Sequence, residues 1–537
     1  MLKDLLIALS LANLCFVRVW HDLLDRPSTS SLNDYFIKSA SSLHVQLAAT
    51  MIAVLALAAL LWTAITVARR STQIFVKRLA RLAFMLLLFY AINGVLLLCG
   101  LHFFQPVVLV DMAALAITTN LTAALFLYAL WRWQPRGPRV MVTLVLVVTP
   151  FVLATFSQAV WSLTKQFADK PTAPFLQGRT ASGARVLWLV FDELDRSETF
   201  VKRPADLKLP EIDRLRGQSV WASNAYAPAS WTVRALPALI TGRLVVKAQA
   251  SRPDELMITF CGATEPVGWS DQPSVFSQAR QLGFNTALVG NYHPYCRLLS
   301  GSLSRCSWEP RDPPRVLSGG LVSTMLKHIL SILSMSDSYQ PIMEITEAEY
   351  LKSRIQRHAL SEFRHAVVIY STTLAEACRV AVDPAFGLIL VHWPVPHPPP
   401  IYDRFTGTFR LPGSSGPEST YLDNLALVDR TLGTLRRDME AAGAWEKTTV
   451  IVSSDHWLRR RFWGYEGVED HRIPFLVKAA GQSKAIVYDR PFNTVLTHDL
   501  ILAILAGRVA SSDDIVAWLD RNRTTGESPC GYQDGVD

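Results

Sequence analysis

The strongest constraint on the fold is a series of apolar runs confined to the first third of the chain. Four of them are long enough to cross a lipid bilayer as helices, namely residues 43–68, 82–104, 107–131 and 140–164. A shorter run from Leu5 to Trp20 contains Arg18 and is interpreted as a further span. A cleaved signal peptide is the competing interpretation, but no small-residue cleavage site follows and only Lys3 supplies a basic start. The sequence therefore predicts a transmembrane domain of about five helices over residues 1–164.

Basic side chains orient these helices in the membrane. Two loops carry them, with Arg69, Arg70, Lys77, Arg78 and Arg81 after the second span and Arg132, Arg136 and Arg139 after the fourth. Short loops rich in lysine and arginine remain in the cytoplasm. We therefore expect a multi-pass protein of the bacterial inner (cytoplasmic) membrane, with everything after Thr164 in the periplasm. The net charge of +8 is partly due to these loops, so it predicts no nucleic-acid partner.

The rest of the chain alternates helix-like and strand-like segments after a linker over residues 165–184. Helical patterns occupy 211–218, 273–282 and 418–442, while the short apolar segment 285–290 is typical of a buried strand. This alternation predicts an α/β domain over residues 185–537, with a mainly parallel sheet and helices on both of its faces. Residues from about 316 to 380 are expected to form a helical insertion.

Two predicted strands end at acidic side chains. An apolar strand over residues 448–452 leads to Asp455 and His456. Another over residues 186–191 leads to an adjacent aspartate and glutamate, Asp192 and Glu193. Open α/β sheets bind their ligands at the carboxyl ends of strands. Carboxylates beside an imidazole suit a divalent zinc or manganese ion, with magnesium or calcium as alternatives.

Three histidines flank other strands of the same domain. His392 and His397 follow the apolar strand over residues 386–391, and His471 stands just before the strand over 473–477. Taken singly, each has an ordinary explanation as part of a loop. Their repetition at the ends of strands on one sheet favours a functional site.

A hydroxyl group marks the start of another predicted helix. The segment from Ser230 to Gly242 is typical of a loop that feeds a helix, with Thr232 at the helix start. Such a hydroxyl often caps the helix. The free backbone N–H groups and the positive end of the helix dipole also favour an attacking oxygen and an incoming phosphate. Thr232 is therefore the candidate nucleophile.

The order of these motifs resembles the alkaline phosphatase superfamily. A strand with Asp-Glu is followed by Trp-Thr-x-x-x-Leu-Pro-x-Leu-x-Thr-Gly-Arg, Pro-His-Pro, Ser-Asp-His and His-x-Ile-Pro-Phe. More narrowly, residues 185–510 resemble the membrane-bound sulfatase-like branch, which includes phosphoethanolamine transferases and lipoteichoic acid synthase. In sulfatases the modified cysteine stands ten residues before the glycine of a Thr-Gly-Arg element, and Thr232 stands ten residues before Gly242.

The resemblance implies roles for the residues above. Thr232 would be the nucleophile and also a ligand of a metal ion, which Asp455, His456 and either or both of Asp192 and Glu193 would hold. The three histidines His392, His397 and His471 would bind substrate, and the last two could also act as acid and base. The ion would lower the pKa of the nucleophile's hydroxyl and neutralise charge on the phosphoryl group.

Three positions depart from the family pattern. Trp457 replaces the usual glycine after Ser-Asp-His, and Leu236 replaces an arginine. Thr232 replaces the cysteine that sulfatases convert to formylglycine, so cleavage of sulfate esters by that route is not expected.

These features predict a phosphotransferase that moves a phospholipid headgroup, phosphoethanolamine or phosphoglycerol, from a membrane phospholipid to an envelope glycan or lipid acceptor. A phospho-threonine would form on the way. A periplasmic phosphodiesterase or sulfatase-like hydrolase would use the same residues, and a non-catalytic lipid-binding regulator could retain the fold, an alternative that Trp457 favours. A transporter is disfavoured, because spans with few buried charges leave no substrate path.

Cysteine positions carry a further prediction. Two of the seven cysteines lie in predicted spans, and five lie in the expected periplasmic domain. Cys296 and Cys306 bracket a nine-residue loop and form the most favoured disulfide.

Overall fold

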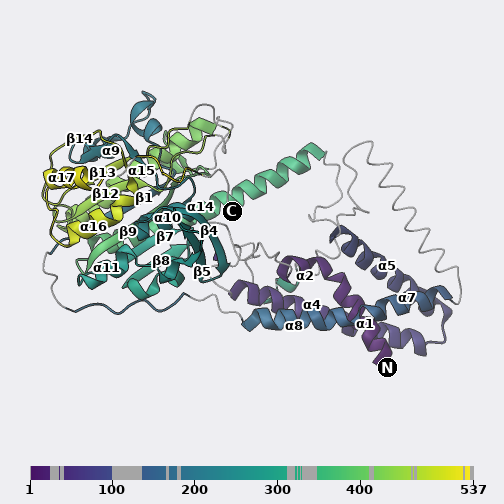
Figure 1. Ribbon diagram of the computed structural model, residues 1–537. Coiled ribbons are helices and arrows are strands. Elements are labelled where there is room, and N and C mark those ends of the chain that lie inside the picture. Colours follow the sequence, from purple (N-terminus) through teal and green to yellow (C-terminus); the bar gives the residue numbers. More distant parts are fainter. Residues whose placement is uncertain are drawn as a thin grey trace. The chain divides into compact units, whose positions relative to one another are not determined.

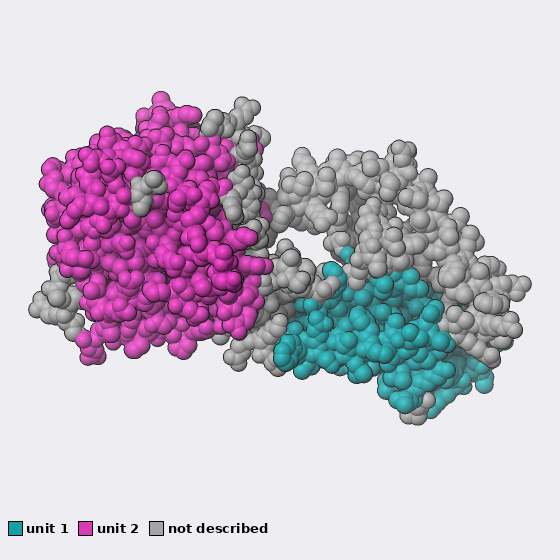
Figure 2. Space-filling model, in the orientation of Figure 1, with its two compact units in different colours: residues 1–30, 39–166, 315–354 teal, residues 31–38, 167–314, 355–537 magenta. Residues whose placement is uncertain are grey.

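The computed structural model forms two compact units. It describes residues 2–24, 35–36, 41–98, 136–164, 169–177, 183–310, 321–322, 324–326, 328, 347–410, 417–460, 464, 469–523 and 526–532. Unit 1 comprises residues 1–30, 39–166 and 315–354, and unit 2 comprises residues 31–38, 167–314 and 355–537 (Figure 2).

Unit 1 is helical (Figure 1). Its helices are α1 (Leu2–Cys15), α2 (Val17–Leu24), α4 (Ser41–Arg70), α5 (Ile74–Leu98), α7 (Arg136–Val147) and α8 (Thr149–Thr164). Two segments, His44–Arg70 and Val142–Leu163, are long and apolar enough to cross a membrane. They agree with two of the predicted spans. The predicted span 107–131 and the end of the span 82–104 lie outside the described residues.

Polar contacts connect the helices of unit 1 around α1. Asn13 is fully buried, and its Oδ1 accepts hydrogen bonds from Trp20 Nε1 at 2.9 Å and Thr155 Oγ1 at 3.2 Å. The hydroxyls of Ser10 and Thr149 lie 3.0 Å apart. These bonds satisfy polar groups inside an otherwise apolar bundle, where a lone polar side chain would be costly.

Unit 2 contains an eight-stranded sheet in the order β14-β2-β13-β12-β1-β9-β7-β8. The bounds are β1 (Val186–Asp192), β2 (Val220–Ala222), β7 (Asn285–Asn291), β8 (Arg305–Glu309), β9 (Phe386–Pro396), β12 (Thr449–Ser454), β13 (Phe475–Lys478) and β14 (Ile486–Tyr488). Only β13 runs antiparallel to its neighbours in this sheet. The expected α/β fold with a mainly parallel sheet is confirmed.

Helices cover both faces of the sheet (Figure 1). Side chains of β1 alternate between two cores, with Val186, Trp188 and Val190 in one and the intervening residues in the other. The first core includes residues of α10 (Thr232–Thr241), α11 (Val275–Gln281), α16 (Thr497–Leu505) and α17 (Ser512–Asn522). The second includes residues of α9 (Pro210–Arg216), α14 (Glu347–Val382) and α15 (Pro417–Ala441).

Smaller elements complete unit 2. They are α12 (Tyr295–Leu298), the antiparallel sheet of β4 (Val245–Arg252), β5 (Glu255–Phe260) and β6 (Val267–Gly268), and the pairs β3 (Ala225–Tyr226) with β15 (Phe492–Asn493) and β10 (Tyr402–Asp403) with β11 (Thr408–Phe409). The predicted Cys296–Cys306 disulfide is present, and a second disulfide, Cys261–Cys530, was not predicted. α14 lies largely within the predicted insertion, much of which falls outside the described residues.

Candidate active site

Three buried side chains meet at the carboxyl ends of the central strands. Asp192 is the last residue of β1, His392 lies in the second half of β9, and Asp455 directly follows β12. β1 pairs in parallel with both of the other strands, so their ends lie side by side. Each side chain offers one ligand atom, and the three atoms lie within 4.8 Å of one another. We call these three residues the metal cluster.

The surroundings of His392 show that this cluster fits a divalent cation. Its Nδ1 lies 3.0 Å from the carbonyl oxygen of Asn291, which can only accept, so Nδ1 carries the proton. Tyr295 Oη lies 3.0 Å from the same nitrogen. Nε2 therefore presents a lone pair, and it is buried without a hydrogen-bond partner in the described part of the chain. A backbone contact of this kind commonly orients a histidine that binds metal.

The sequence predicts that His392 binds substrate, whereas the structure places it beside Asp192 and Asp455. β9 runs five residues further than the predicted strand, to Pro396, and this extension places His392 inside the sheet with no exposed surface. Its ring can reach the two carboxylates of the metal cluster but does not line an open surface.

The adjacent acidic residues Asp192 and Glu193 have different environments. Glu193 has a positive φ of 62°, which turns its side chain away from the line of β1. Its Oε1 lies 2.7 Å from Arg459 Nε and 2.6 Å from Arg459 Nη2. The structure therefore assigns Asp192 to the metal cluster and Glu193 to an ion pair, a choice that the sequence left open.

Thr232 lies beside the metal cluster at the start of α10. Trp231 is the N-cap residue of this helix, and no side chain caps its first turn. Thr232 Oγ1 lies 3.2 Å from His456 Nε2. The capping explanation for Thr232 is therefore wrong. The Arg234 N–H already donates to the Trp231 carbonyl oxygen at 3.0 Å, so the N–H groups of Thr232 and Val233 are the ones that could face an anion.

His456 connects Thr232 with the carboxylates. Its Nδ1 lies 3.0 Å from the carbonyl oxygen of Trp457, so Nδ1–H donates and Nε2 presents a lone pair. Nε2 is 3.3 Å from Asp455 Oδ2 and 3.7 Å from Asp192 Oδ1. His456 is therefore close enough to the metal cluster to serve as a further ligand, as expected from the sequence.

Burial controls protonation at this site. It raises the pKa of Asp455 to about 7 and lowers the pKa of His392 to about 4. It also lowers the pKa of His456 well below its usual value, and the Arg459 guanidinium adds to this shift. The histidines are thus held in the neutral form that binds metal ions. A cation would offset the cost of burying the carboxylates without a counter-charge.

The other predicted histidines lie in different places. The backbone N–H of His397 donates to the carbonyl oxygen of Asp192 at 3.1 Å, which places this buried residue at the same strand end. His471 contacts the C-terminal segment. Its Nδ1 is 3.5 Å from Glu527 Oε1, and its ring centroid is 4.5 Å from that of Tyr532.

Trp457, which replaces the expected glycine, is accommodated inside the protein. It is 1% exposed and packs with Ala227 and Ile473, and its Nε1 donates to Glu469 Oε2 at 3.0 Å. The bulky side chain is therefore accommodated in a small apolar core.

Sequence reasoning missed several residues that surround the site. Arg459 binds Glu193 and also lies over the ring of Trp231, with its Cζ 3.9 Å from the ring centroid. Tyr295 contacts His392. His293 contacts the carbonyl oxygen of Thr232. The run of three arginines that begins at Arg459 was a signal for this residue, because basic residues beside acidic strand ends favour ion pairs. No motif indicated the other two.

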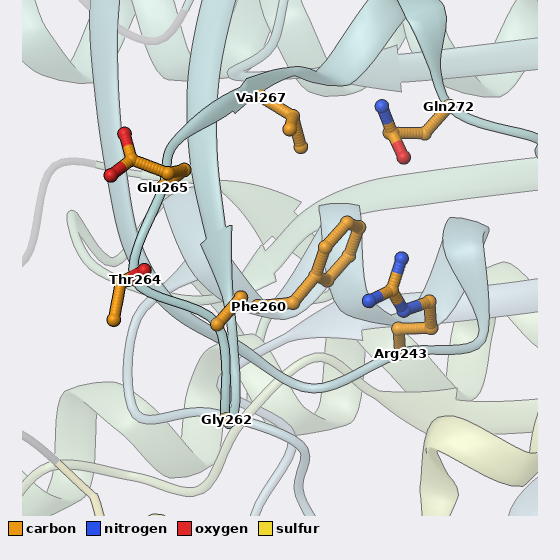
Figure 3. A pocket seen from close by; sticks show the side chains of 8 residues that line it. Arg243, Phe260, Gly262, Thr264, Glu265, Val267 and Gln272 are labelled. Carbon is orange, nitrogen blue, oxygen red and sulfur yellow. The ribbon is translucent and has the colours of Figure 1, made fainter.

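A surface pocket of about 380 Å³ lies elsewhere in unit 2 (Figure 3). Arg243 follows the C-cap of α10, whereas Thr232 begins this helix. A helix of this length separates its ends by roughly 15 Å. The pocket is therefore distinct from the metal cluster. It is lined by Arg243, Phe260, Gly262, Ala263, Thr264, Glu265, Val267 and Gln272.

Comparison with known protein families identifies part of this unit. Residues 383–507 match the sulfatase family, which is a family of enzymes. The matched region contains His392, Asp455 and His456 but neither Asp192 nor Thr232. No curated protein matches the chain.

Several solved structures show limited similarity. A sulfatase from Pseudoalteromonas sp. is 16% identical, with 61% of this chain and 68% of that chain covered and a TM-score of 0.39. The phosphonate monoester hydrolase of Silicibacter pomeroyi is 15% identical, with 60% and 73% covered and a TM-score of 0.37. A protein in the alkaline phosphatase superfamily from Vibrio parahaemolyticus is 15% identical, with 62% and 68% covered and a TM-score of 0.37. The fold assignment rests on the sheet topology described above.

Proposed function

We propose that this protein is a membrane-anchored, metal-dependent phosphotransferase. It would move a phospholipid headgroup, phosphoethanolamine or phosphoglycerol, to a glycan or lipid acceptor. The observation that carries the proposal is the position of Thr232, whose hydroxyl oxygen lies 3.2 Å from His456 Nε2 beside the metal cluster. The sulfatase family match of residues 383–507 supports ester chemistry at this site.

The residue type at position 232 favours phosphoryl over sulfuryl transfer. Threonine cannot be converted to formylglycine, but its hydroxyl oxygen can accept a phosphoryl group directly. The Thr232 hydroxyl hydrogen-bonds the Asp455 carboxylate and its oxygen lies 3.2 Å from His456 Nε2, so the oxygen is held beside the metal cluster with lone pairs that can face a substrate. The N–H groups of Thr232 and Val233 at the start of α10 could donate to the oxygens of a bound phosphate.

Asp192, His392 and Asp455 would hold the metal ion, with His456 as a further ligand. A bound zinc or manganese ion would act there as a Lewis acid that neutralises negative charge on the phosphoryl group. Neutral imidazoles and ionised carboxylates are the donor forms that such an ion requires.

The reaction would proceed in two displacements. In the first, the Thr232 oxygen bonds to phosphorus, the bond from phosphorus to the diacylglycerol oxygen breaks, and diacylglycerol leaves with the hydroxyl proton. In the second, an acceptor hydroxyl bonds to phosphorus and the bond to Thr232 breaks. Thr232 then recovers a proton from the acceptor, so the enzyme returns to its starting state.

The helical unit supports a lipid donor. Two segments of unit 1 could span a membrane and would keep the site on a chain tethered to the bilayer. Two disulfides in unit 2 favour an oxidising compartment such as the periplasm. With these features we extend the proposal to a multi-pass inner-membrane protein with a periplasmic catalytic domain.

A hydrolase is the second candidate, and the sulfatase family match is the observation that favours it. The two candidates share the first displacement and differ only in the acceptor, which is water for the hydrolase. Steady release of headgroup phosphate without any acceptor would identify the hydrolase.

The test uses the full-length protein in detergent with isotope-labelled phosphatidylethanolamine and phosphatidylglycerol. We expect diacylglycerol release and, without acceptor, a labelled peptide that carries the headgroup phosphate on Thr232. Thr232→Ala should abolish both signals. Thr232→Ser should keep partial activity, because the oxygen survives while the methyl group that restricts its rotamer is lost.

The matched control is Thr434→Ala, which removes the same atoms from a partly exposed position on α15. It should leave both signals unchanged. Diacylglycerol release at the wild-type rate by Thr232→Ala would exclude the covalent route.

A further inference from the structure

Tyr35 and Phe36 belong to unit 2 although the helices on either side of them in the sequence belong to unit 1. Tyr35 is fully buried and is part of the core that contains α10 and the first face of β1. Phe36 packs on Tyr292, with the ring centroids 5.0 Å apart. Residues from the N-terminal third of the chain therefore help to build the interior of unit 2.

Tyr35 reaches the backbone of the nucleophile through one histidine. Its Oη lies 2.7 Å from His293 Nδ1, and His293 Nε2 lies 3.3 Å from the carbonyl oxygen of Thr232. The carbonyl can only accept, so Nε2 must carry the proton that faces it. Nδ1 of a neutral ring then accepts, and the Tyr35 hydroxyl donates to it. The tyrosine thus determines which nitrogen of His293 faces Thr232.

Aromatic rings hold His293 in this orientation. Trp269 and Tyr292 lie with their ring centroids 5.0 Å from that of His293, and Tyr295 lies at 5.6 Å, all at steep angles to its plane. His293 itself has no exposed surface. A ring packed this closely cannot turn without displacing its neighbours, so the two hydrogen bonds act as one rigid connection.

Arg297 fixes the backbone of Tyr35 from the other side. Its Nη2 donates to the Tyr35 carbonyl oxygen at 3.0 Å, and its Cζ lies 5.1 Å from the ring centroid of Trp308. Trp308 Nε1 in turn donates to Asp169 Oδ1 at 2.9 Å. The neighbouring Cys296 is joined to Cys306, which ties this segment to β8. Tyr35 is therefore held at its side chain and its backbone.

We propose that Tyr35 is a positioning residue for the reaction at Thr232. It fixes His293, which fixes the carbonyl group of Thr232 at the start of α10, and so sets the direction of the nucleophilic oxygen. Unit 2 is then incomplete without the segment that contains Tyr35 and Phe36. The inference rests on the proposed function, since it assigns Thr232 as the nucleophile.

The test is Tyr35→Phe in the full-length protein, which removes the hydroxyl and keeps the ring. We expect kcat to fall by between about 10-fold and 100-fold while KM changes little, because a small misplacement of a reacting group is costly. Hydrogen–deuterium exchange should become faster in the first turn of α10 and stay unchanged in α15. Bound metal should stay at the wild-type level.

Tyr370→Phe is the matched control. Tyr370 is also buried, its hydroxyl lies 2.7 Å from Thr431 Oγ1, and it belongs to the core on the other face of the sheet. This variant loses an equivalent hydrogen bond and should keep the wild-type kcat and the wild-type exchange at α10. An equal fall of kcat in both variants would show a general effect of stability and would overturn the proposal.

A second variant tests the route through His293. In His293→Gln the side-chain amide can still donate to the Thr232 carbonyl oxygen. An amide has no tautomers between which Tyr35 would have to select. Adding Tyr35→Phe to this background should then cause no further fall in kcat, whereas independent roles would make the two effects multiply.

Failure of the two proposals can be told apart. If the wild-type protein transfers neither headgroup, the proposed function is wrong, and the exchange experiment still reports whether Tyr35 orders the start of α10. If the wild type is active and Tyr35→Phe matches it in kcat and in exchange, only the role of Tyr35 is wrong.

Discussion

His392 shows how one backbone carbonyl can select the metal-binding atom of a histidine. The Asn291 carbonyl holds the proton on Nδ1, so Nε2 faces the carboxylates of Asp192 and Asp455 with its lone pair. Buried carboxylates without a counter-charge destabilise a protein. The three residues therefore have a structural as well as a chemical reason to bind a cation.

Replacing one carboxylate should remove the metal without unfolding the protein. In Asp455→Asn the amide oxygen can still accept the N–H groups of Glu193 and His456, which lie 3.1 Å and 2.8 Å from Asp455 Oδ1. The negative charge is lost, so we expect most of the bound metal and the activity to be lost while the thermal midpoint stays similar to that of metal-free wild type. Elemental analysis measures the metal content.

Asp489→Asn is the control, because Asp489 is an exposed aspartate distant in sequence from the cluster. It should keep the full metal content. Full metal content in Asp455→Asn as well would remove Asp455 from the site.

Not every residue of the site could be assigned from the sequence. The motifs placed Asp192, Thr232, Asp455 and His456 together, because parallel strands bring their carboxyl ends to one edge. They could not separate Asp192 from Glu193, since the choice depends on the positive φ of Glu193 and on its ion pair with Arg459. Both of these depend on tertiary contacts.

At the scale of elements, one helix start is capped by a different helix. Asp429 on α15 accepts the N–H groups of Glu211 and Ile212, at 2.9 Å and 2.8 Å, in the first turn of α9. Burial raises the pKa of Asp429 to about 6 from an ordinary value of 3.8. The folded state therefore binds more protons than the unfolded state between about pH 4 and pH 6. Stability from this group is present below that range and is lost as the pH rises through it.

Asp429→Asn should change this pH dependence. Asparagine keeps the accepting oxygen but carries no charge, so it avoids the cost of ionising a buried carboxyl. Raising the pH from 4 to 7 should increase the free energy of unfolding of the variant, relative to that of the wild type, by on the order of 2 kcal/mol. Chemical denaturation of the full-length protein at both pH values measures it.

Asp513→Asn serves as the comparison, because Asp513 is exposed on α17. It should show no shift of this size. A constant difference for Asp429→Asn at both pH values would mean that the buried carboxyl does not titrate in this range.

Element prediction succeeded where the apolar period was clear. The predicted helices near α9, α11 and α15 and the strand β7 are confirmed within a few residues. The antiparallel sheet β4-β5-β6 was not predicted, because its strands are partly exposed and β4 pairs with β5 in an irregular register. β9 extends beyond its apolar run through His392 to Pro396, since pairing with β1 continues there.

At the scale of the whole molecule, the loop charges require a defined topology. Arg78 should lie on the cytoplasmic side, and Ser182, which precedes β1, should lie in the periplasm. Fusions of alkaline phosphatase and of a cytoplasmic fluorescent reporter at these two positions measure this directly. A cytoplasmic signal after Ser182 would exclude both the five-span topology and the periplasmic assignment.

The two disulfides differ in what they connect. Cys296–Cys306 closes a loop of 10 residues in sequence separation, whereas Cys261–Cys530 joins positions 269 residues apart. The spacing of cysteines favours short loops, so the long connection was not predictable. It fixes the C-terminal segment, where Tyr532 donates to the Ala227 carbonyl at 2.9 Å and packs on Trp457 and His471.

Loss of the long connection should therefore have the larger effect. By loop-closure entropy, Cys261–Cys530 contributes on the order of 5 kcal/mol and Cys296–Cys306 about 3 kcal/mol. Cys530→Ser should lower the denaturation midpoint of the full-length protein more than Cys306→Ser does. It should also speed the reaction of His471 with diethylpyrocarbonate, since Tyr532 and Glu527 would no longer be fixed beside the imidazole. A smaller loss of stability in Cys530→Ser, with His471 as protected as in the wild type, would show that the C-terminal segment is held by packing alone.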